Sequence, residues 1–451
     1  MLITKYTSQL LGMVSQAQRD KDLELEVLIK NYQNNKITSE MFYNTIKRLK
    51  GTSNIVYKDE EEILDIIING ENIRFSIIGN DNILNYCQTN NIKSIDDKNL
   101  DILKKTPVSK TDINEYRIRF NLKRETVLNK SNKQVLDIIT KWNSLDKIFR
   151  YKKRISFITS DNNYQYDLTV LKSSNKKNVN GPNTFIKKRN IKDHMKKYVV
   201  SPDNILDFDE WFDSLKPYDN VTMIGKMTEI PMPSKNIKKS NIFHNELEYE
   251  IELEYVGNKR KSSKNDKSVL LGILQNSMLI LQSIQKSYYI ISEFEKNDVI
   301  SKYKSIIGDY KFNGPMNVTL EKKHVLERKY GDYNNIISIR KGYAVTDKAD
   351  GERNLLIIID NGKMYLLNRK NDVKYLGASC LELAGSIFDC EYILKDKNNN
   401  NINILMIFDA YFYNGEDIRN RILNRSNEEK TDGKIDKSRY EYVIDGMKLV
   451  D

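Results

Sequence analysis

The sequence predicts an α+β protein whose amino-terminal part is an antiparallel β-barrel with a charged interior. From about residue 55 to 256, most segments alternate apolar and polar residues, which is typical of half-buried strands. Whole strand faces carry charge of one sign, and separate strands carry opposite signs. An open sheet with a solvated face usually mixes signs, whereas a closed barrel with acidic and basic interior walls explains the pattern. Helices predicted over 1–20 and 37–51 supply the α component.

Length and composition narrow the function classes. A chain of 451 residues predicts two or three domains. Lysine and arginine outnumber aspartate and glutamate by 73 to 62, which favours polyanionic partners. The three cysteines lack zinc-finger spacing, and only three histidines are present, so we expect chemistry by carboxylates, lysine and arginine. Neither a signal peptide nor an apolar run near ~20 residues is found, which predicts a soluble intracellular protein.

Two acidic strands mark the first candidate site. Glu24 and Glu26 alternate with apolar residues in DLELEVLI (22–29). Far along the chain, ELEYEIELEY alternates glutamates in the same way, at Glu246, Glu248, Glu250, Glu252 and Glu254. Residues two apart on a strand share a face, so each strand carries a carboxylate face. Such a face needs a neutralising cation, and carboxylate oxygens suit a hard divalent one.

Basic strands complement the acidic ones. Alternating cations occur in NIRFSIIG, YRIRF and FRYKKRISF, at Arg74, Arg117, Arg119, Arg150, Lys152 and Arg154. Such faces bind phosphate oxygens through charge-assisted hydrogen bonds. For any one strand, an ordinary solvated sheet face remains the alternative; the set as a whole favours a barrel that binds a polyphosphate and a metal.

The quoted segments resemble a known family. ELEV with EIELE, and the basic strands between them, resemble the triphosphate tunnel metalloenzymes, specifically the metal-dependent RNA triphosphatases of viral and fungal-type capping enzymes. The resemblance covers about residues 20–256. It implies that Mg²⁺ or Mn²⁺ is bound by glutamates that are also catalytic, namely Glu24, Glu26, Glu252 and Glu254, with Glu250 as a further metal ligand. It also implies that the six basic residues above bind phosphate and that Asp167 is another acidic tunnel residue.

Domain boundaries follow from a polar segment. GNKRKSSKNDKS (257–268) has no apolar periodicity and is the predicted linker. The tunnel domain would therefore span 1–256. The second domain would span 269–451 and begin with an amphipathic helix.

A lysine motif marks the second candidate site. KADGER (348–353) fits the pattern K-x-D-G-x-R between two strand-like segments. Lys348 would then lie at a strand end beside a glycine turn, where backbone can approach a phosphate. Taken alone, the Asp-Gly pair is also a common hairpin turn. Asp389 and Glu391 follow two residues apart on one strand face, and Asp409 comes at the next strand end.

These motifs resemble the lysine-dependent nucleotidyltransferases, which comprise mRNA capping guanylyltransferases and ATP- or NAD-dependent ligases. The resemblance implies that Lys348 attacks the α-phosphate of GTP and forms a lysyl-GMP intermediate. The implied nucleotide-binding residues are Lys348, Asp350, Gly351, Arg353, Asp389 and Glu391. Where the family has a glycine between the last two carboxylates, this chain has Cys390. The family's later motifs and its OB-fold are missing, so we expect an incomplete nucleotidyltransferase domain.

The order of the two domains is that of capping enzymes in poxviruses, asfarviruses and giant viruses such as Mimivirus. It implies hydrolysis of the γ-phosphate of 5′-triphosphate RNA, then GMP transfer from GTP. The implied partners are RNA, GTP and a methyltransferase domain or subunit, with no membrane. The implied location is the host cytoplasm, in a viral factory, or the virion. The alternatives are a polynucleotide ligase with a polyphosphatase domain and a non-catalytic subunit that binds RNA 5′ ends.

Overall fold

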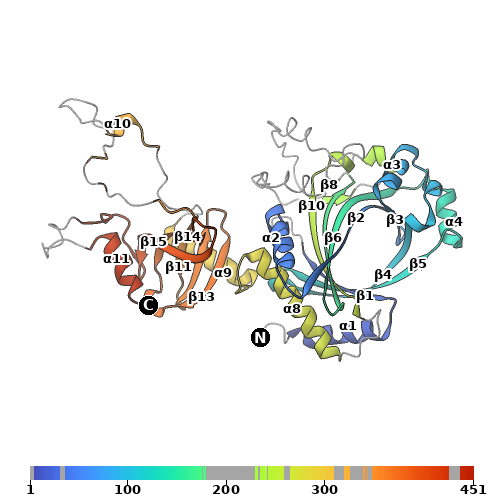
Figure 1. Ribbon diagram of the computed structural model, residues 1–451. Helices are drawn as coiled ribbons and strands as arrows, with labels where there is room; N and C mark the ends of the chain where they lie inside the picture. The colour runs from blue at the N-terminus through green and yellow to red at the C-terminus, as the bar shows by residue number, and fades with distance from the viewer. Residues whose placement is uncertain are drawn as a thin grey trace. The chain divides into compact units, whose positions relative to one another are not determined.

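The computed structural model describes residues 5–30, 36–174, 176–178, 229–231, 234–240, 242–257, 265–308, 319–325, 339–340, 343, 348–425 and 437–450. The chain divides into two compact units, Met1–Lys286 and Ser287–Asp451. Each unit is described below by itself, and Figure 1 labels the elements of both.

The first unit is built on eight antiparallel strands that close on themselves. Their order is β1-β10-β7-β6-β2-β3-β4-β5, and β1 pairs with both β10 and β5. The strands are β1 (Leu23–Ile29), β2 (Ile55–Ile68), β3 (Ile73–Ile78), β4 (Leu100–Ile113), β5 (Ile118–Leu128), β6 (Lys147–Thr159), β7 (Tyr164–Ser173) and β10 (Glu248–Tyr255). Two three-residue strands, β8 (Lys176–Asn178) and β9 (Glu229–Pro231), pair separately.

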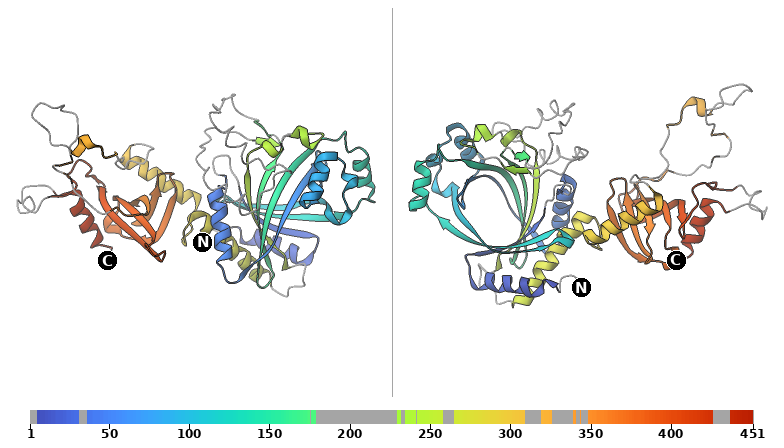
Figure 2. Two further views of the ribbon diagram at one scale, coloured as in Figure 1. Left: turned by 45° about the horizontal axis from the view of Figure 1, so that its top comes forward. Right: turned by 180° about the vertical axis from the view of Figure 1, so that it is seen from behind.

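Helices lie against the outside of the barrel (Figure 2). The α-helices of this unit are α1 (Thr7–Arg19), α2 (Ser39–Lys50), α3 (Asn80–Thr89), α4 (Lys133–Thr140), α7 (Ile237–Ser240) and α8 (Asp266–Gln285). Short 3-10 turns are η2 (Ile92–Ser94), η3 (Asp97–Asn99), η4 (Asn114–Tyr116) and η5 (Ile242–His244). The predicted helix over 37–51 is present: the Thr38 side chain accepts from the Met41 amide at its start, and Gly51 follows its end.

Contacts with these helices show which strand face points outward. The Phe42 ring of α2 packs on Tyr249 of β10, and the Tyr164 hydroxyl of β7 donates to the Val269 carbonyl of α8. Tyr249 shares its face of β10 with the apolar residues Ile251, Leu253 and Tyr255, which are buried. Because side chains alternate along a strand, the charged residues between them point into the barrel.

Helix α8 belongs to the first unit, which corrects the predicted boundary at 268/269. The helix packs against α1 and α2, and Gly272 allows the close approach of Tyr164. A Cβ at Gly272 would lie 2.0 Å from the Tyr164 hydroxyl. The amphipathic face that predicted a new domain is thus buried on the barrel's outer layer. By length and composition α8 could cross a membrane, but its apolar residues Val269, Leu270 and Ile273 are buried in this packing.

The second unit contains a six-stranded antiparallel sheet in the order β13-β12-β11-β14-β15-β16. Its strands are β11 (Glu352–Ile358), β12 (Lys363–Asn368), β13 (Val373–Ser379), β14 (Ile387–Lys395), β15 (Asn401–Tyr413) and β16 (Glu416–Asp417). Its helices are α9 (Glu293–Ile307), α10 (Lys322–Val325), η7 (Leu381–Leu383) and α11 (Arg439–Met447).

Alternate residues of β11 build two cores on the two faces of this sheet. Leu355 and Ile357 pack with Val299 and Tyr303 of α9. On the other face, Leu356 and Ile358 pack with Val443 of α11. Strands buried on both faces read as continuous apolar runs, which explains NLLIIID. The predicted asparagine-rich hairpin lies between β14 and β15, where the Asp396 carboxylate accepts from the Asn398 and Asn400 amides.

Candidate functional site

The predicted acidic residues gather on one inner wall of the barrel. β1 and β10 pair so that Glu26 is opposite Glu254 and Leu28 is opposite Glu252. Glu24 and Glu250 extend the same wall along the two strands. Carboxylates directly opposite each other on paired strands destabilise a sheet unless a cation lies between or beside them. The tertiary fold thus brings together segments that are more than two hundred residues apart.

Glu252 experiences this repulsion most directly. Burial, together with the carboxylates of Glu250 and Glu26, raises the pKa of Glu252 to about 7. Arg154 and Lys152 act in the opposite direction but do not cancel it. A cation bound beside Glu252 would offset the repulsion from these two glutamates and would stabilise the ionised form of Glu252.

The donor set fits a hard divalent cation by its chemistry. It consists of carboxylate oxygens on adjacent strands, and Mg²⁺ and Mn²⁺ prefer oxygen ligands. Within the residues that the structure describes, no three His, Cys, Asp or Glu side chains converge as a ready ligand cluster. The carboxylates of Glu24 and Glu26 instead contact Lys105 and Lys123 respectively.

The predicted basic strand β6 forms a second charged wall, separated from β10 by β7 alone, and each of its three predicted cations has an acidic partner. Arg150 Nη2 lies 2.6 Å from Glu250 Oε1. Arg154 Nη1 lies 3.5 Å from Asp167 Oδ2, so the predicted acidic residue Asp167 does face the interior. Lys152 pairs with Asp65, which also lies 3.8 Å from Arg74 Nη1. Four of the six predicted phosphate-binding residues thus share this part of the barrel interior, and a fifth, Arg119, lies on the same inward face of β5 as Asn121 and Lys123.

Asp65 is a central residue of this wall that the sequence analysis missed. It is 1% exposed, and its Oδ1 accepts a 2.7 Å hydrogen bond from the Ser76 hydroxyl. Burial alone would raise the pKa of Asp65, but Lys152 and Arg74 outweigh burial and hold this pKa well below its usual range. The available signal was a single charged residue inside the apolar run ILDIII.

Arg117 and Arg119 do not share a face, contrary to the prediction. Arg117 precedes β5 in a left-handed conformation, with φ of 58°, which interrupts the alternation. The Nη2 of Arg117 donates to the Lys30 carbonyl at 3.0 Å. This hydrogen bond stabilises the backbone where β1 ends. Arg119 lies on β5 and pairs with Asp112 through two contacts of 2.6 and 3.0 Å. The bond from Arg119 lowers the pKa of Asp112 to about 2.

The lysine motif of the second unit lies where β11 begins. Lys348 and Asp350 are exposed, and the Gly351 amide donates to Glu391 Oε1 at 3.1 Å. A Cβ at Gly351 would lie 2.6 Å from the Tyr392 carbonyl oxygen, so the turn requires glycine. The carboxylate of Glu391 therefore holds the turn that carries the lysine.

Arg353 is held by a buried carboxylate. Arg353 lies opposite Glu391 in the β11–β14 register, and its Nε donates to Asp389 Oδ1 at 2.9 Å. Asp389 is fully buried and also accepts a hydrogen bond from the Tyr411 hydroxyl. Tyr411 was not predicted to contribute, since nothing in YFYNG distinguishes it from its aromatic neighbours.

Cys390 on β14 and Asp409 on β15 both have hydrogen-bond partners in neighbouring elements. Cys390 is buried, and its thiol donates to the Asn354 carbonyl at 3.2 Å without disturbing the register between β11 and β14. Burial raises the pKa of this thiol. Asp409 on β15 accepts two hydrogen bonds from Arg439 of α11, at 2.8 and 3.1 Å, and so links the helix to the sheet.

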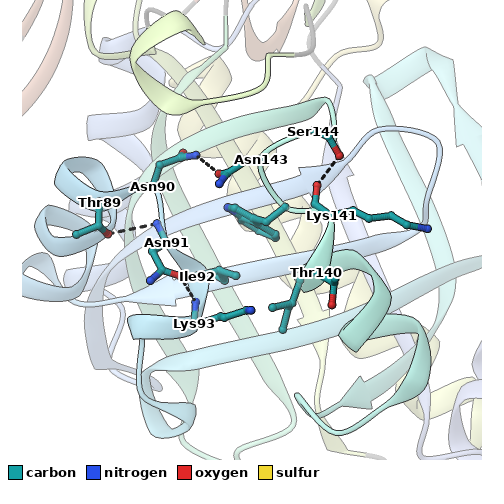
Figure 3. Close-up of a pocket in the computed structure, with 11 residues that line it drawn as sticks. Thr89, Asn90, Asn91, Ile92, Lys93, Thr140, Lys141, Asn143 and Ser144 are labelled. Carbon is teal, nitrogen blue, oxygen red and sulfur yellow. Dashed lines mark hydrogen bonds between the residues drawn. The ribbon is translucent and has the colours of Figure 1, made fainter.

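A cavity of about 610 Å³ lies outside the barrel, between α3 and α4 (Figure 3). Amide side chains and backbone dominate its lining, and the Asn90 amide donates to Asn143 Oδ1 across it at 3.1 Å. None of the predicted site residues lines it. The candidate chemistry therefore lies inside the barrel and at the start of β11.

Comparison with known proteins finds a family match that covers most of the second unit. Residues 280–446 match the family described as mRNA capping enzyme, catalytic domain. The chain is similar to a probable mRNA-capping enzyme of Acanthamoeba polyphaga mimivirus, with 32% identity over 173 residues. That alignment covers 38% of this chain and 13% of the relative, so the chain matches a small part of the relative's length.

Solved structures of two RNA triphosphatases also align with the chain. The RNA triphosphatase domain of the trifunctional mimivirus mRNA capping enzyme shows 17% identity and a TM-score of 0.34, covering 60% of this chain and 96% of that one. An S. pombe RNA triphosphatase shows 12% identity and a TM-score of 0.31, covering 60% and 91%. The barrel itself is defined by the strand pairing of this chain.

Proposed function

We propose that this chain, whose residues 280–446 match the catalytic domain of the mRNA capping enzyme family, performs the first two steps of capping. In the barrel, the γ-phosphate is hydrolysed from 5′-triphosphate RNA. In the second unit, GMP is transferred from GTP to the resulting RNA end. The observation that carries the first step is the pair of adjoining walls of opposite charge, carboxylates on β1 and β10 and cations on β6, inside one closed barrel.

The basic wall suits a triphosphate. Arg150, Lys152 and Arg154 lie on one face of one strand, largely shielded from water. Shielded cations bind phosphate oxygens strongly and stabilise the charge that grows on the leaving diphosphate. Incoming phosphates would take over the contacts that Glu250, Asp65 and Asp167 now make.

The acidic wall suits a divalent cation. Glu24, Glu26, Glu252 and Glu254 would hold Mg²⁺ or Mn²⁺, with Glu250 beside them. When bound, such a cation polarises the γ-phosphoryl group and favours attack by water. The glutamates would hold it beside the cations of β6, which would bind the phosphates. Glu252 would bind it in the ionised form, since cation binding favours loss of the carboxyl proton.

The second unit suits nucleotidyl transfer. Neutral Lys348 Nζ attacks the α-phosphorus of GTP; the new N–P bond forms as the bond to the β-phosphate oxygen breaks and pyrophosphate leaves. The lysine proton must first be lost to solvent or to a neighbouring base. Arg353, fixed by Asp389, would contact the nucleotide, and the Gly351 turn would let backbone approach the phosphates.

The first experiment measures release of phosphate from γ-labelled 5′-triphosphate RNA with a divalent cation. We expect release by the intact chain and loss with chelator, in Glu24→Ala and in Glu252→Ala. Glu71→Ala, which removes an exposed glutamate, should retain activity. Absence of release by folded, metal-supplied protein contradicts the triphosphatase proposal and favours a subunit that only binds RNA ends.

The second experiment labels the protein with α-labelled nucleotide. We expect a covalent adduct with GTP that is absent in Lys348→Met. Labelling by ATP in place of GTP would instead favour a polynucleotide ligase. The methyltransferase partner and the location in host cytoplasm or virion stay predictions.

A further inference from the structure

Two lysines that were not among the predicted tunnel cations contact the acidic wall. Lys105 Nζ of β4 lies 3.1 Å from Glu24 Oε2 and also pairs with Glu125. Lys123 of β5 pairs with Glu26, whose Oε1 also accepts a 3.0 Å hydrogen bond from Asn121 Nδ2. Both lysines therefore bind the carboxylates that were assigned to the divalent cation.

The strand order explains why β1 has two sets of neighbours. On one side β10 brings Glu254 opposite Glu26. On the other side β5 brings Lys123 opposite Glu24 and Asn121 opposite Glu26. The β1 glutamates thus lie between the carboxylates of β10 on one side and the ammonium group of β5 on the other.

A carboxylate in this position needs a cation at all times. Glu26 is 4% exposed, and an uncompensated buried charge is costly. An ammonium and a divalent cation can each satisfy it, but the two cations repel each other at contact distance. The lysine side chains are 25% and 27% exposed and sit on flexible stems, so they have room to turn away.

We propose that Lys105 and Lys123 are resident counter-ions of the metal-free barrel. They neutralise Glu24 and Glu26, compete with the divalent cation for these carboxylates, and turn to the triphosphate once the cation has bound. The inference rests on the proposed triphosphatase function. It gives binding an order, because arrival of the cation releases two ammonium groups for the anionic substrate.

The test measures the affinity of the intact chain for Mn²⁺. Free Mn²⁺ is monitored by its electron paramagnetic resonance signal. Lys105→Met and Lys123→Met should each tighten Mn²⁺ binding roughly threefold to tenfold, because a competing positive charge is removed. Lys104→Met is the matched control. Lys104 precedes Lys105 on β4, so its side chain points to the opposite face of the strand. Its Nζ donates to Gln134 Oε1 at 3.4 Å. It should leave the affinity nearly unchanged.

Two further readouts separate this role from simple structural support. Without metal, Lys123→Met should melt at a lower temperature than the unmodified chain, and Mn²⁺ should raise its melting temperature by more. With saturating Mn²⁺, both variants should bind a non-hydrolysable β,γ-imido nucleoside triphosphate more weakly, since a phosphate contact is lost.

The outcomes are distinguishable from failure of the proposed function. If the unmodified chain binds Mn²⁺ and releases phosphate, but folded Lys105→Met and Lys123→Met bind Mn²⁺ no more tightly, the counter-ion role is overturned alone. If the unmodified chain binds no divalent cation, the metal-dependent triphosphatase is overturned as well.

Discussion

Asp65 on β2 and Lys152 on β6 form an ion pair inside the barrel, with side-chain exposures of 2% and 4%. The pair is backed by Arg74 and by the Ser76 hydroxyl. A buried pair of this kind is sensitive to loss of one partner, because the other charge is then left without compensation.

Asp65→Asn should therefore destabilise the barrel by about 3–5 kcal/mol, measured by urea unfolding. The double variant Asp65→Asn/Lys152→Met should recover part of this loss, since it removes the orphaned charge as well. Additive effects of the two substitutions would contradict a coupled pair. Because the pKa of Asp65 is lowered on folding, its contribution is present above the usual carboxyl pKa and is lost as the pH falls.

Glu252 should show the opposite pH dependence. Its pKa is raised to about 7 in the folded barrel, so folding favours the protonated form. The stability it contributes is complete below the ordinary glutamate pKa and is lost as the pH rises through about 7. In the absence of metal, Glu252→Gln should therefore be more stable than the unmodified chain at pH 8, on the order of 1–2 kcal/mol.

Thermal melts at two pH values in chelator check this prediction. At about pH 4 the advantage of Glu252→Gln should vanish, because both chains then carry a neutral group at this position. Glu71→Gln, at an exposed site, should show no such pH dependence. An advantage of equal size at both pH values would contradict the raised pKa as its cause.

Gly351→Ala should impair the lysine site without harming the barrel. The added Cβ meets the Tyr392 carbonyl oxygen at 2.6 Å, so the turn that carries Lys348 must shift. We expect formation of the lysyl-nucleotide to fall by roughly tenfold to a hundredfold, as misplacement of a reacting group does. Phosphate release should be unchanged. Gly12→Ala, where nothing lies within 4 Å of the added atom, is the control.

Tyr411→Phe should weaken the support of Arg353. The substitution removes one hydrogen bond to buried Asp389 and leaves the bonds from the guanidinium. The expected cost is about 1–2 kcal/mol of stability, with a lower rate of nucleotidyl transfer. Tyr413→Phe alters a neighbouring hydroxyl on the same strand and should be close to neutral. Equal effects of the two would argue against a specific role for Tyr411.

Much of the architecture could be read from local patterns. Period-two alternation predicted the strands of the first unit, and KADGER between two strand-like segments predicted a strand-end lysine beside a glycine turn. Residues 280–446 match the family described as mRNA capping enzyme, catalytic domain, which supports the prediction made from these motifs. The single-sign strand faces predicted that carboxylates of β1 and β10 would share a wall, and they do.

What the sequence by itself determined was therefore which residues alternate, which carry charge of one sign, and which motif identifies the second unit. Only the tertiary structure decided which charges meet. Arg117 left the expected face because its backbone turns through a left-handed conformation before β5 begins. Helix α8 joined the barrel because Tyr164 fits against Gly272. Asp65, Lys105 and Lys123 became partners of the tunnel residues because pairing between distant strands, and not sequence spacing, sets the distance between charges.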